Sequence, residues 1–124
     1  MEQNDSVMNK FINNLPVELH LYDPIVGHYS ACGPGTRTAD RIKKYVETGD
    51  TNQIYKNELD KNCFYHDVAY GKHKDVSNRL NADKVLMDAA IIIANDPSKN
   101  EWERKLAGLV ALFFHKKIQA GIGI

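Results

Sequence analysis

The chain has 124 residues, a length that suits one domain and leaves no room for a second full core. Its 43% hydrophobic and 26% charged residues are typical of a globular protein and exclude an intrinsically disordered one. Sixteen basic and sixteen acidic residues cancel, so net charge attracts the chain neither to nucleic acid nor to an anionic membrane. We expect residues 1–124 to form a single domain, in which residues 1–14 could be a flexible N-terminal segment.

The N-terminus lacks the basic and then apolar layout of a signal peptide, and no apolar run reaches membrane-spanning length. Two cysteines, Cys32 and Cys63, are too few for a disulfide-rich scaffold, although they could form one bridge. Composition therefore leaves the compartment open.

The first half of the chain is predicted to be irregular, because prolines and glycines interrupt it repeatedly. A short helix is expected over Thr38–Thr48, with Ile42, Tyr45 and Val46 facing inward and its basic side chains in solvent.

The second half is predicted to be helical. A first long helix should begin at the N-cap Asn57 and end near His73, and a second should run from about Ser77 to Asn95, where Asp96-Pro97 stops it.

A third helix should follow the capping box Ser98-Lys99-Asn100-Glu101 and end at Gly121. Its predicted apolar stripe consists of Trp102, Leu106, Leu109, Val110 and Phe113.

Asp83 is an unexpected residue in the second helix. It shares a helical stripe with Leu80, Met87, Ala90 and Ile91. A carboxylate in an apolar stripe is costly unless another group pairs with it or donates a hydrogen bond to it. Asp83 therefore lies either at an exposed edge of the stripe or beside a donor on a facing helix.

The first long helix carries two neighbouring strips of polar residues. His66 and Tyr70 are four residues apart on one strip and can both donate to a carboxylate, while Cys63 and Asp67 share the other strip. If the two helices are antiparallel, His66 and Tyr70 can reach Asp83 while Asp67 faces elsewhere. A histidine held by a buried carboxylate is the arrangement of a general base.

The glycine-rich segment before these helices contains Gly33 and Gly35. Glycines allow the backbone to point its carbonyl oxygens inward, and calcium accepts such oxygens together with a carboxylate. By itself, Gly-Pro-Gly is typical of a turn. If Cys32 and Cys63 were bridged, the loop would lie beside the strip that carries Asp67, and the two could share one cation.

Three stretches, in this order, resemble a known family: Cys32-Gly33-Pro34-Gly35, Cys63-Phe64-Tyr65-His66-Asp67-Val68-Ala69-Tyr70 and Ala82-Asp83. The combination resembles the phospholipase A2 superfamily. It is most similar to the phospholipase A2-like domain in minor capsid proteins of parvoviruses and to related stand-alone invertebrate or viral proteins. Leu15–His20 resembles the lead-in of the invertebrate group, and the similarity covers about residues 15 to 123.

The resemblance implies a calcium-dependent enzyme that hydrolyses the sn-2 ester of glycerophospholipids at a membrane surface. His66 matches the base that deprotonates a water, Asp83 the carboxylate that orients this base, and Tyr70 the tyrosine that supports the network.

The resemblance also implies the metal ligands. Ala31, Gly33 and Gly35 match the loop positions whose carbonyls bind calcium, and Asp67 matches the carboxylate ligand. The Gly33 N–H would help to stabilise the oxyanion. The expected fold is mainly α, with two long antiparallel helices that carry the active site, a third C-terminal helix and an irregular N-terminal calcium loop.

The chain departs from secreted members of the family, which carry many disulfides. Its two cysteines, Cys32 and Cys63, match one pair that joins loop to catalytic helix, so the core must come from helix packing. Residues 36–59 fit the family only loosely, as if they contained a small insertion. Parvoviral capsid proteins are also far longer than this sequence.

Two other functions stay open. The chain has spacings compatible with a Cys2His2 zinc site made of His28, Cys32, Cys63 and His66. Such a site would leave Asp67 and Asp83 without a role. The chain could also be an inactive relative that binds lipid or supports assembly. The expected partner is a phospholipid membrane surface, and not nucleic acid, because no basic stripe is concentrated anywhere.

The type of calcium site bears on location. Open loop sites bind calcium weakly, with dissociation constants of roughly 10⁻⁵ to 10⁻³ M. Such a site would be filled outside cells or in an endocytic lumen, so a virion or an endocytic compartment would suit a viral origin.

Overall fold

The computed structural model describes residues 20–33 and 38–121, apart from the side chains of Thr38 and Asn52. Three features of the sequence lie outside the described residues: the proposed flexible segment 1–14, the lead-in over 15–19, and Gly35 with its neighbours.

Helices make up most of the described chain, so the predicted mainly α fold class is confirmed. They are α2 (Thr38–Thr48), α3 (Glu58–Lys72), α4 (Val76–Ala94) and α5 (Glu101–Ala120). Before them, strands β1 (Tyr22–Asp23) and β2 (Gly27–His28) pair antiparallel, and the 3-10 turn η1 (Thr51–Gln53) lies between α2 and α3. None of the helices among the described residues is long and apolar enough to cross a membrane.

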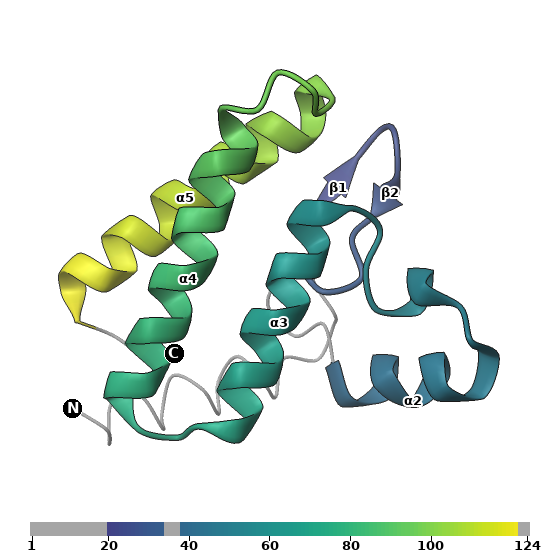
Figure 1. The fold of residues 1–124 in the computed structure, drawn as a ribbon, viewed down its shortest axis with the longest axis horizontal. Helices are drawn as coiled ribbons and strands as arrows, with labels where there is room; N and C mark the ends of the chain where they lie inside the picture. Colours follow the sequence, from purple (N-terminus) through teal and green to yellow (C-terminus); the bar gives the residue numbers. More distant parts are fainter. Residues whose placement is uncertain (1–19, 34–37, 122–124) are drawn as a thin grey trace.

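The three long helices lie side by side, with α4 between α3 and α5 (Figure 1). A short connection over residues 73–75 turns the chain back, so α3 and α4 form a helical hairpin. α2 stands apart from this layer, on the far side of α3 (Figure 1). The buried side chains gather where the β1–β2 hairpin, α3, α4 and α5 meet, and include Tyr29, Cys32, Leu59, Leu86, Ala90, Ile93 and Ala107.

The helix ends follow local chemistry. Asn57 caps α3 as predicted, since its side chain accepts the N–H of Asp60 at 3.0 Å. α4 begins after Asp75, which caps it in the same way. Gly121 ends α5 in the left-handed region with φ 72°, so the predicted terminator is confirmed.

The predicted capping box at the start of α5 is wrong. Asn100 is the cap, because its side chain accepts the N–H of Glu103 at 2.8 Å. The hydroxyl of Ser98 instead donates to Asp96 at 2.7 Å, within the turn that follows α4. Asp96, the residue before Pro97, therefore accepts a hydrogen bond from Ser98, which the sequence pattern had assigned to the cap of α5.

The predicted buried face of α2 is also wrong, although the bounds of the helix are confirmed. Ile42 and Tyr45 are exposed, and Val46 is 76% exposed. Among the described residues, α2 packs mainly on η1 and only slightly on α3. An apolar helical face is buried only where another element covers it.

The face that α5 buries differs from the predicted stripe. Trp102, Leu109 and Phe113 are exposed, Leu106 is half-buried, and Val110 is buried as expected. The other residues buried on this helix are Glu103, Ala107 and Lys117. α5 is thus rotated so that two charged side chains face the neighbouring helices.

The stripe around Asp83 is largely as predicted. Asp83 and Ala90 are fully buried, and Leu80 and Met87 are half-buried. Ile91 is exposed, which corrects its predicted burial. The first alternative for Asp83, an exposed edge, is therefore excluded.

Candidate functional site

Asp83 is the centre of a polar cluster that joins three helices. Its Oδ1 atom lies 2.7 Å from Nε2 of His66 and accepts the Tyr70 hydroxyl at 2.6 Å, and both partners come from α3. The prediction that these two residues of α3 reach Asp83 is confirmed. Because Asp83 is fully buried, these donors supply what water would otherwise provide.

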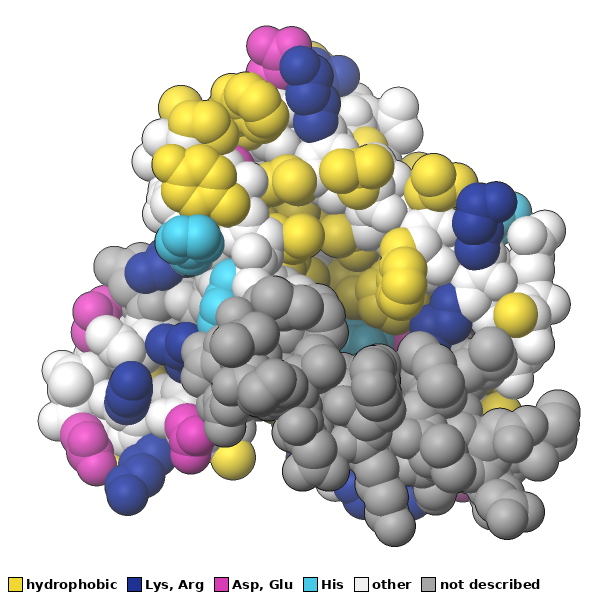
Figure 2. Space-filling view, turned by 180° about the vertical axis from the view of Figure 1, so that it is seen from behind, with side chains coloured by type: hydrophobic (Ala, Val, Ile, Leu, Met, Phe, Trp, Pro, Cys, Tyr) yellow, Lys and Arg dark blue, Asp and Glu magenta, His cyan; other side chains and the backbone are white. Residues whose placement is uncertain are grey.

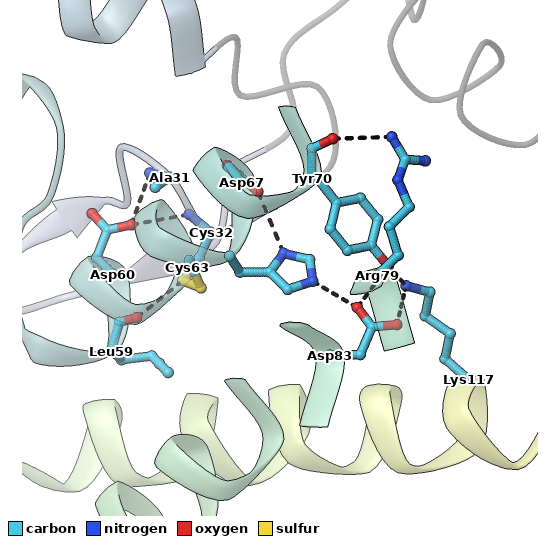
Figure 3. Close-up of polar contacts among 11 residues, drawn as sticks. Ala31, Cys32, Leu59, Asp60, Cys63, Asp67, Tyr70, Arg79, Asp83 and Lys117 are labelled. Atoms are coloured by element: carbon cyan, nitrogen blue, oxygen red, sulfur yellow. Dashed lines mark hydrogen bonds and ion pairs between the residues drawn. A yellow bond between two sulfur atoms is a disulfide. The ribbon is translucent and has the colours of Figure 1, made fainter. Parts of the chain in front are cut away.

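The third partner of Asp83 comes from α5 and was not expected from the sequence. Nζ of Lys117 lies 2.6 Å from Oδ2 of Asp83 and donates to the Tyr70 hydroxyl. Figure 3 shows Asp83, Tyr70 and Lys117 converging from their separate helices. Buried lysines are rare unless paired, so the pairing explains why Lys117 faces the layer.

The imidazole of His66 lies between two carboxylates. Its Nε2 faces Asp83, and its Nδ1 is 3.6 Å from Oδ1 of Asp67, as the dashed lines in Figure 3 mark. The Nε2 atom donates to the shorter contact when the ring is neutral, so the lone pair then belongs to Nδ1. The nitrogen that can accept a proton thus faces the side of Asp67.

The surroundings of His66 determine its basicity. Burial lowers the pKa of the ring, but the hydrogen bonds and charges of Asp67 and Asp83 outweigh this and raise the pKa above 6.5. The ring of Phe114 meets the imidazole edge-on at 5.0 Å between centroids. The site therefore combines a basic ring nitrogen with an apolar side chain beside it.

Arg79 supports the cluster from α4 and was also missed. Its Nε donates to the carbonyl of His73 at 2.7 Å and its guanidinium to the carbonyl of Tyr70 at 3.0 Å. The same guanidinium lies 4.7 Å from the centroid of the Tyr70 ring. Arg79 thereby satisfies carbonyls at the end of α3 and confines the tyrosine.

A second buried carboxylate, Asp60, holds the segment before Gly33. It accepts the backbone N–H groups of Ser30 (2.7 Å), Ala31 (2.8 Å) and Cys32 (2.9 Å), and that of Lys56 (2.8 Å). Burial raises the pKa of Asp60, and these four hydrogen bonds offset part of the shift. The sequence pattern did not point to this role of Asp60.

The contacts of Asp60 also set the direction of the loop carbonyls. In a trans peptide the N–H and C=O groups point in opposite directions. Since the N–H of Cys32 points at Asp60, the carbonyl of Ala31 points away from it. A backbone carbonyl must point away from the core in this way if it is to bind a cation outside the core.

Cys32 and Cys63 form a disulfide, so the pairing implied by the resemblance is confirmed. The bridge joins the segment before Gly33 to α3, one turn before Asp67. Both sulfurs are consumed, so neither is a thiolate available to zinc, and the Cys2His2 arrangement loses two of its four ligands.

The expected calcium ligands are placed only in part. Asp67 is half-buried on α3, and Gly33 has φ 126°, a backbone conformation that favours glycine. No three His, Cys, Asp or Glu side chains gather in the described ranges 20–33 and 38–121 in a way that could hold a metal. A set of one carboxylate and three backbone carbonyls would not form such a group.

Comparison with models of known families, with curated proteins and with solved structures finds no significant match to this chain. The geometry of the site and the resemblance of its motifs are therefore what bear on function.

Proposed function

We propose that this chain is a calcium-dependent phospholipase A2 that hydrolyses the sn-2 ester of glycerophospholipids at a membrane surface. The placement of the His66 ring carries the proposal. One nitrogen is held by the fully buried Asp83, and the other lies toward Asp67, the proposed metal ligand. A general base requires this division, in which one nitrogen is fixed and the other is directed at the reactants.

His66 would take a proton on Nδ1 from a water molecule as the water oxygen attacks the ester carbonyl. The ester bond then breaks and the same proton passes to the departing alcohol. Asp83 orients the ring through Nε2 and stabilises the positive charge that the ring gains. The Tyr70 hydroxyl, at 2.6 Å, helps to keep the carboxylate in place.

The proposed calcium ligands are the carbonyls of Ala31, Gly33 and Gly35 and the carboxylate of Asp67. Hard cations prefer such oxygen sets. Two observations support the fit: the Ala31 carbonyl points away from Asp60, and the disulfide fixes this segment to the helix of Asp67. When bound, calcium would polarise the ester carbonyl and favour negative charge on its oxygen. The Gly33 N–H would be a second donor to that oxygen.

Half-buried apolar side chains support a lipid substrate, and one of them, Phe114, contacts the His66 ring. Figure 2 shows hydrophobic side chains gathered over the middle of one face of the molecule. The half-buried hydrophobic residues packed on the core include Leu21, Val26, Phe64, Leu106 and Phe114. Such side chains favour contact with acyl chains over contact with a polar substrate.

The main competing function is that of an inactive module that binds lipid or supports assembly. This alternative makes no use of the alignment of His66 with Asp83, a buried polar arrangement that is costly to build. A zinc module is disfavoured by the disulfide.

The test is release of fatty acid from phosphatidylcholine vesicles with calcium and with chelator, for the wild type and His66→Ala. We expect calcium-dependent release by the wild type and a loss of about 10³-fold in the variant, because general bases contribute on that order. His73→Ala is the matched control, since His73 lies outside the cluster at the end of α3. Equal release in all samples would refute the proposal.

A further inference from the structure

Lys117 places a positive charge inside the helical layer. Its side chain is 5% exposed, in the last turn of α5, where a lysine would normally extend into water. Removing an ammonium group from water is unfavourable unless an anion and hydrogen-bond acceptors replace the water. Asp83 and the Tyr70 hydroxyl fill these roles.

The two oxygens of Asp83 are divided between its partners. Oδ1 faces His66 and Tyr70, both on α3, while Oδ2 faces Lys117 alone among the contacts of the described residues. A carboxylate with only the first two partners could turn about its side-chain bonds and present either oxygen. The ammonium at 2.6 Å on the opposite oxygen removes this freedom.

The charges of Lys117 and Asp83 also favour a fixed Asp83 carboxylate. Asp83 is fully buried, so no solvent compensates its negative charge, and the ammonium of Lys117 at 2.6 Å provides that compensation. The aromatic rings near Nζ provide further favourable contacts, with the Tyr70 and Phe114 centroids at 4.7 Å and 5.3 Å. Phe114 also meets the imidazole, so α5 contacts both ends of the His66–Asp83 pair.

We infer that Lys117 is a positioning residue of the hydrolytic site: its ammonium holds Oδ2 of Asp83, so that Oδ1 stays directed at His66. The inference rests on the proposed function. It gives α5 a role in the reaction, although the sequence motifs that suggested a hydrolytic site lie on α3 and α4 and in the loop before them.

A purely structural role, in which Lys117 only joins α5 to the other helices, is the alternative. The two roles differ in what Lys117→Met changes. Methionine keeps the length of the side chain and removes its charge. Lys116→Met is the matched control, because Lys116 is the exposed neighbour on the same turn.

We expect Lys117→Met to lower kcat by about tenfold or more, since the base loses its orientation, while KM and the calcium dissociation constant stay within about twofold. Lys117→Arg should recover part of the rate, and methylammonium should partly restore Lys117→Ala in proportion to its concentration. A wild-type kcat in Lys117→Met would overturn the inference, as would a loss that only follows the fraction of unfolded protein.

A second measurement does not depend on activity. Two-bond ¹H–¹⁵N spectra at a pH where the ring is neutral report which nitrogen of His66 carries the proton. We expect the Nε2–H form in the wild type and a mixture of the two forms in Lys117→Met. An unchanged spectrum would overturn the inference. If the wild type releases no fatty acid, the proposed function fails by itself, and this spectrum still decides what Lys117 does.

Lys117→Met could also fail to fold, because it leaves Asp83 buried without its cation. Adding Asp83→Asn removes the second charge, so the double variant should fold better than Lys117→Met alone. A double variant that is no more stable would show that the ion pair is not what joins α5 to the site.

Discussion

Asp60 and Asp83 are both fully buried carboxylates, but the molecule uses them differently. Asp60 accepts four backbone N–H groups, from residues 30–32 and from Lys56. Among the described residues, Asp83 accepts from side chains alone, those of His66, Tyr70 and Lys117. Backbone donors can neither titrate nor change rotamer, whereas all three side chains around Asp83 can gain or lose a proton.

This difference in partners indicates different roles for Asp60 and Asp83. Asp60 fixes a segment of chain, so its effect should appear in stability and in the geometry of the proposed calcium loop. Asp83 fixes the ring of the proposed base, so its effect should appear in the rate of the proposed hydrolysis. The same chemical change at each position is therefore expected to give two different defects.

The largest effect is expected for Asp83→Asn. An amide cannot stabilise the imidazolium and permits the wrong tautomer, so kcat should fall by about 10³-fold. Lys117 is left without its counterion, so the free energy of unfolding should fall by about 3 to 5 kcal/mol. Steady-state kinetics and denaturant unfolding measure the two changes.

Asp88→Asn is the control for this variant, because Asp88 is exposed on the same helix. Calcium affinity should be unchanged in both variants. If Asp83→Asn weakened calcium binding as much as it slowed hydrolysis, the separation of the two carboxylates would be wrong.

A smaller effect is expected for Asp60→Asn. The amide would oppose some of the four N–H donors, and unsatisfied buried donors cost about 1 to 3 kcal/mol. The loop carbonyls would lose their fixed direction, so the calcium dissociation constant should rise about tenfold, equivalent to about 1.4 kcal/mol. Calorimetry measures it, and hydrolysis at saturating calcium should recover. A variant with wild-type calcium affinity would contradict the role given to Asp60.

The smallest effect concerns pH. The raised pKa of His66 means that, without calcium, its stabilising contribution is fully present below pH 6.5 and is lost as the pH rises through the higher pKa. Only the neutral ring can act as a base, so hydrolysis should fall as the pH drops through the pKa that His66 has with calcium bound, which we expect to be lower than the calcium-free value. NMR titration of calcium-free protein should give a midpoint above 6.5.

The same titration of Asp67→Asn tests the cause of the raised pKa, because Asp67 is one of the two carboxylates that raise the pKa of His66. The variant should titrate at lower pH than the wild type, and calcium should shift the wild type in the same direction. A calcium-free midpoint at or below 6.5 would contradict the arrangement of His66 between the two aspartates.

The helices and the His66–Asp83 contact were predictable because their determinants are local. Asn57 and Gly121 have the side chain and the backbone freedom that helix ends require. His66 and Tyr70 share one strip of α3, and a carboxylate within an apolar stripe of α4 predicts a donor opposite it.

Lys117 could not be found in this way, because the buried face of α5 depends on what the other helices present. This helix has apolar residues on several faces, so hydrophobicity favoured Leu109 and Phe113, which are exposed. The rotation observed instead brings Lys117 to Asp83 and Glu103 to the N–H of Leu59. Asp60 was missed for a similar reason, since three of its four backbone partners lie 28 to 30 residues away.

The Cys32–Cys63 disulfide makes one part of the site dependent on the chemical surroundings. Glutathione and thioredoxin keep such pairs reduced in the cytosol, where the segment before Gly33 would be held by Asp60 without its covalent tether. Resting cytosol is also poor in the cation that the proposed site would bind. Both conditions change in the same sense when a protein passes from a reducing, calcium-poor compartment to an oxidising, calcium-rich one. A hydrolase built in this way would be restrained where it is made and completed where it meets its membrane.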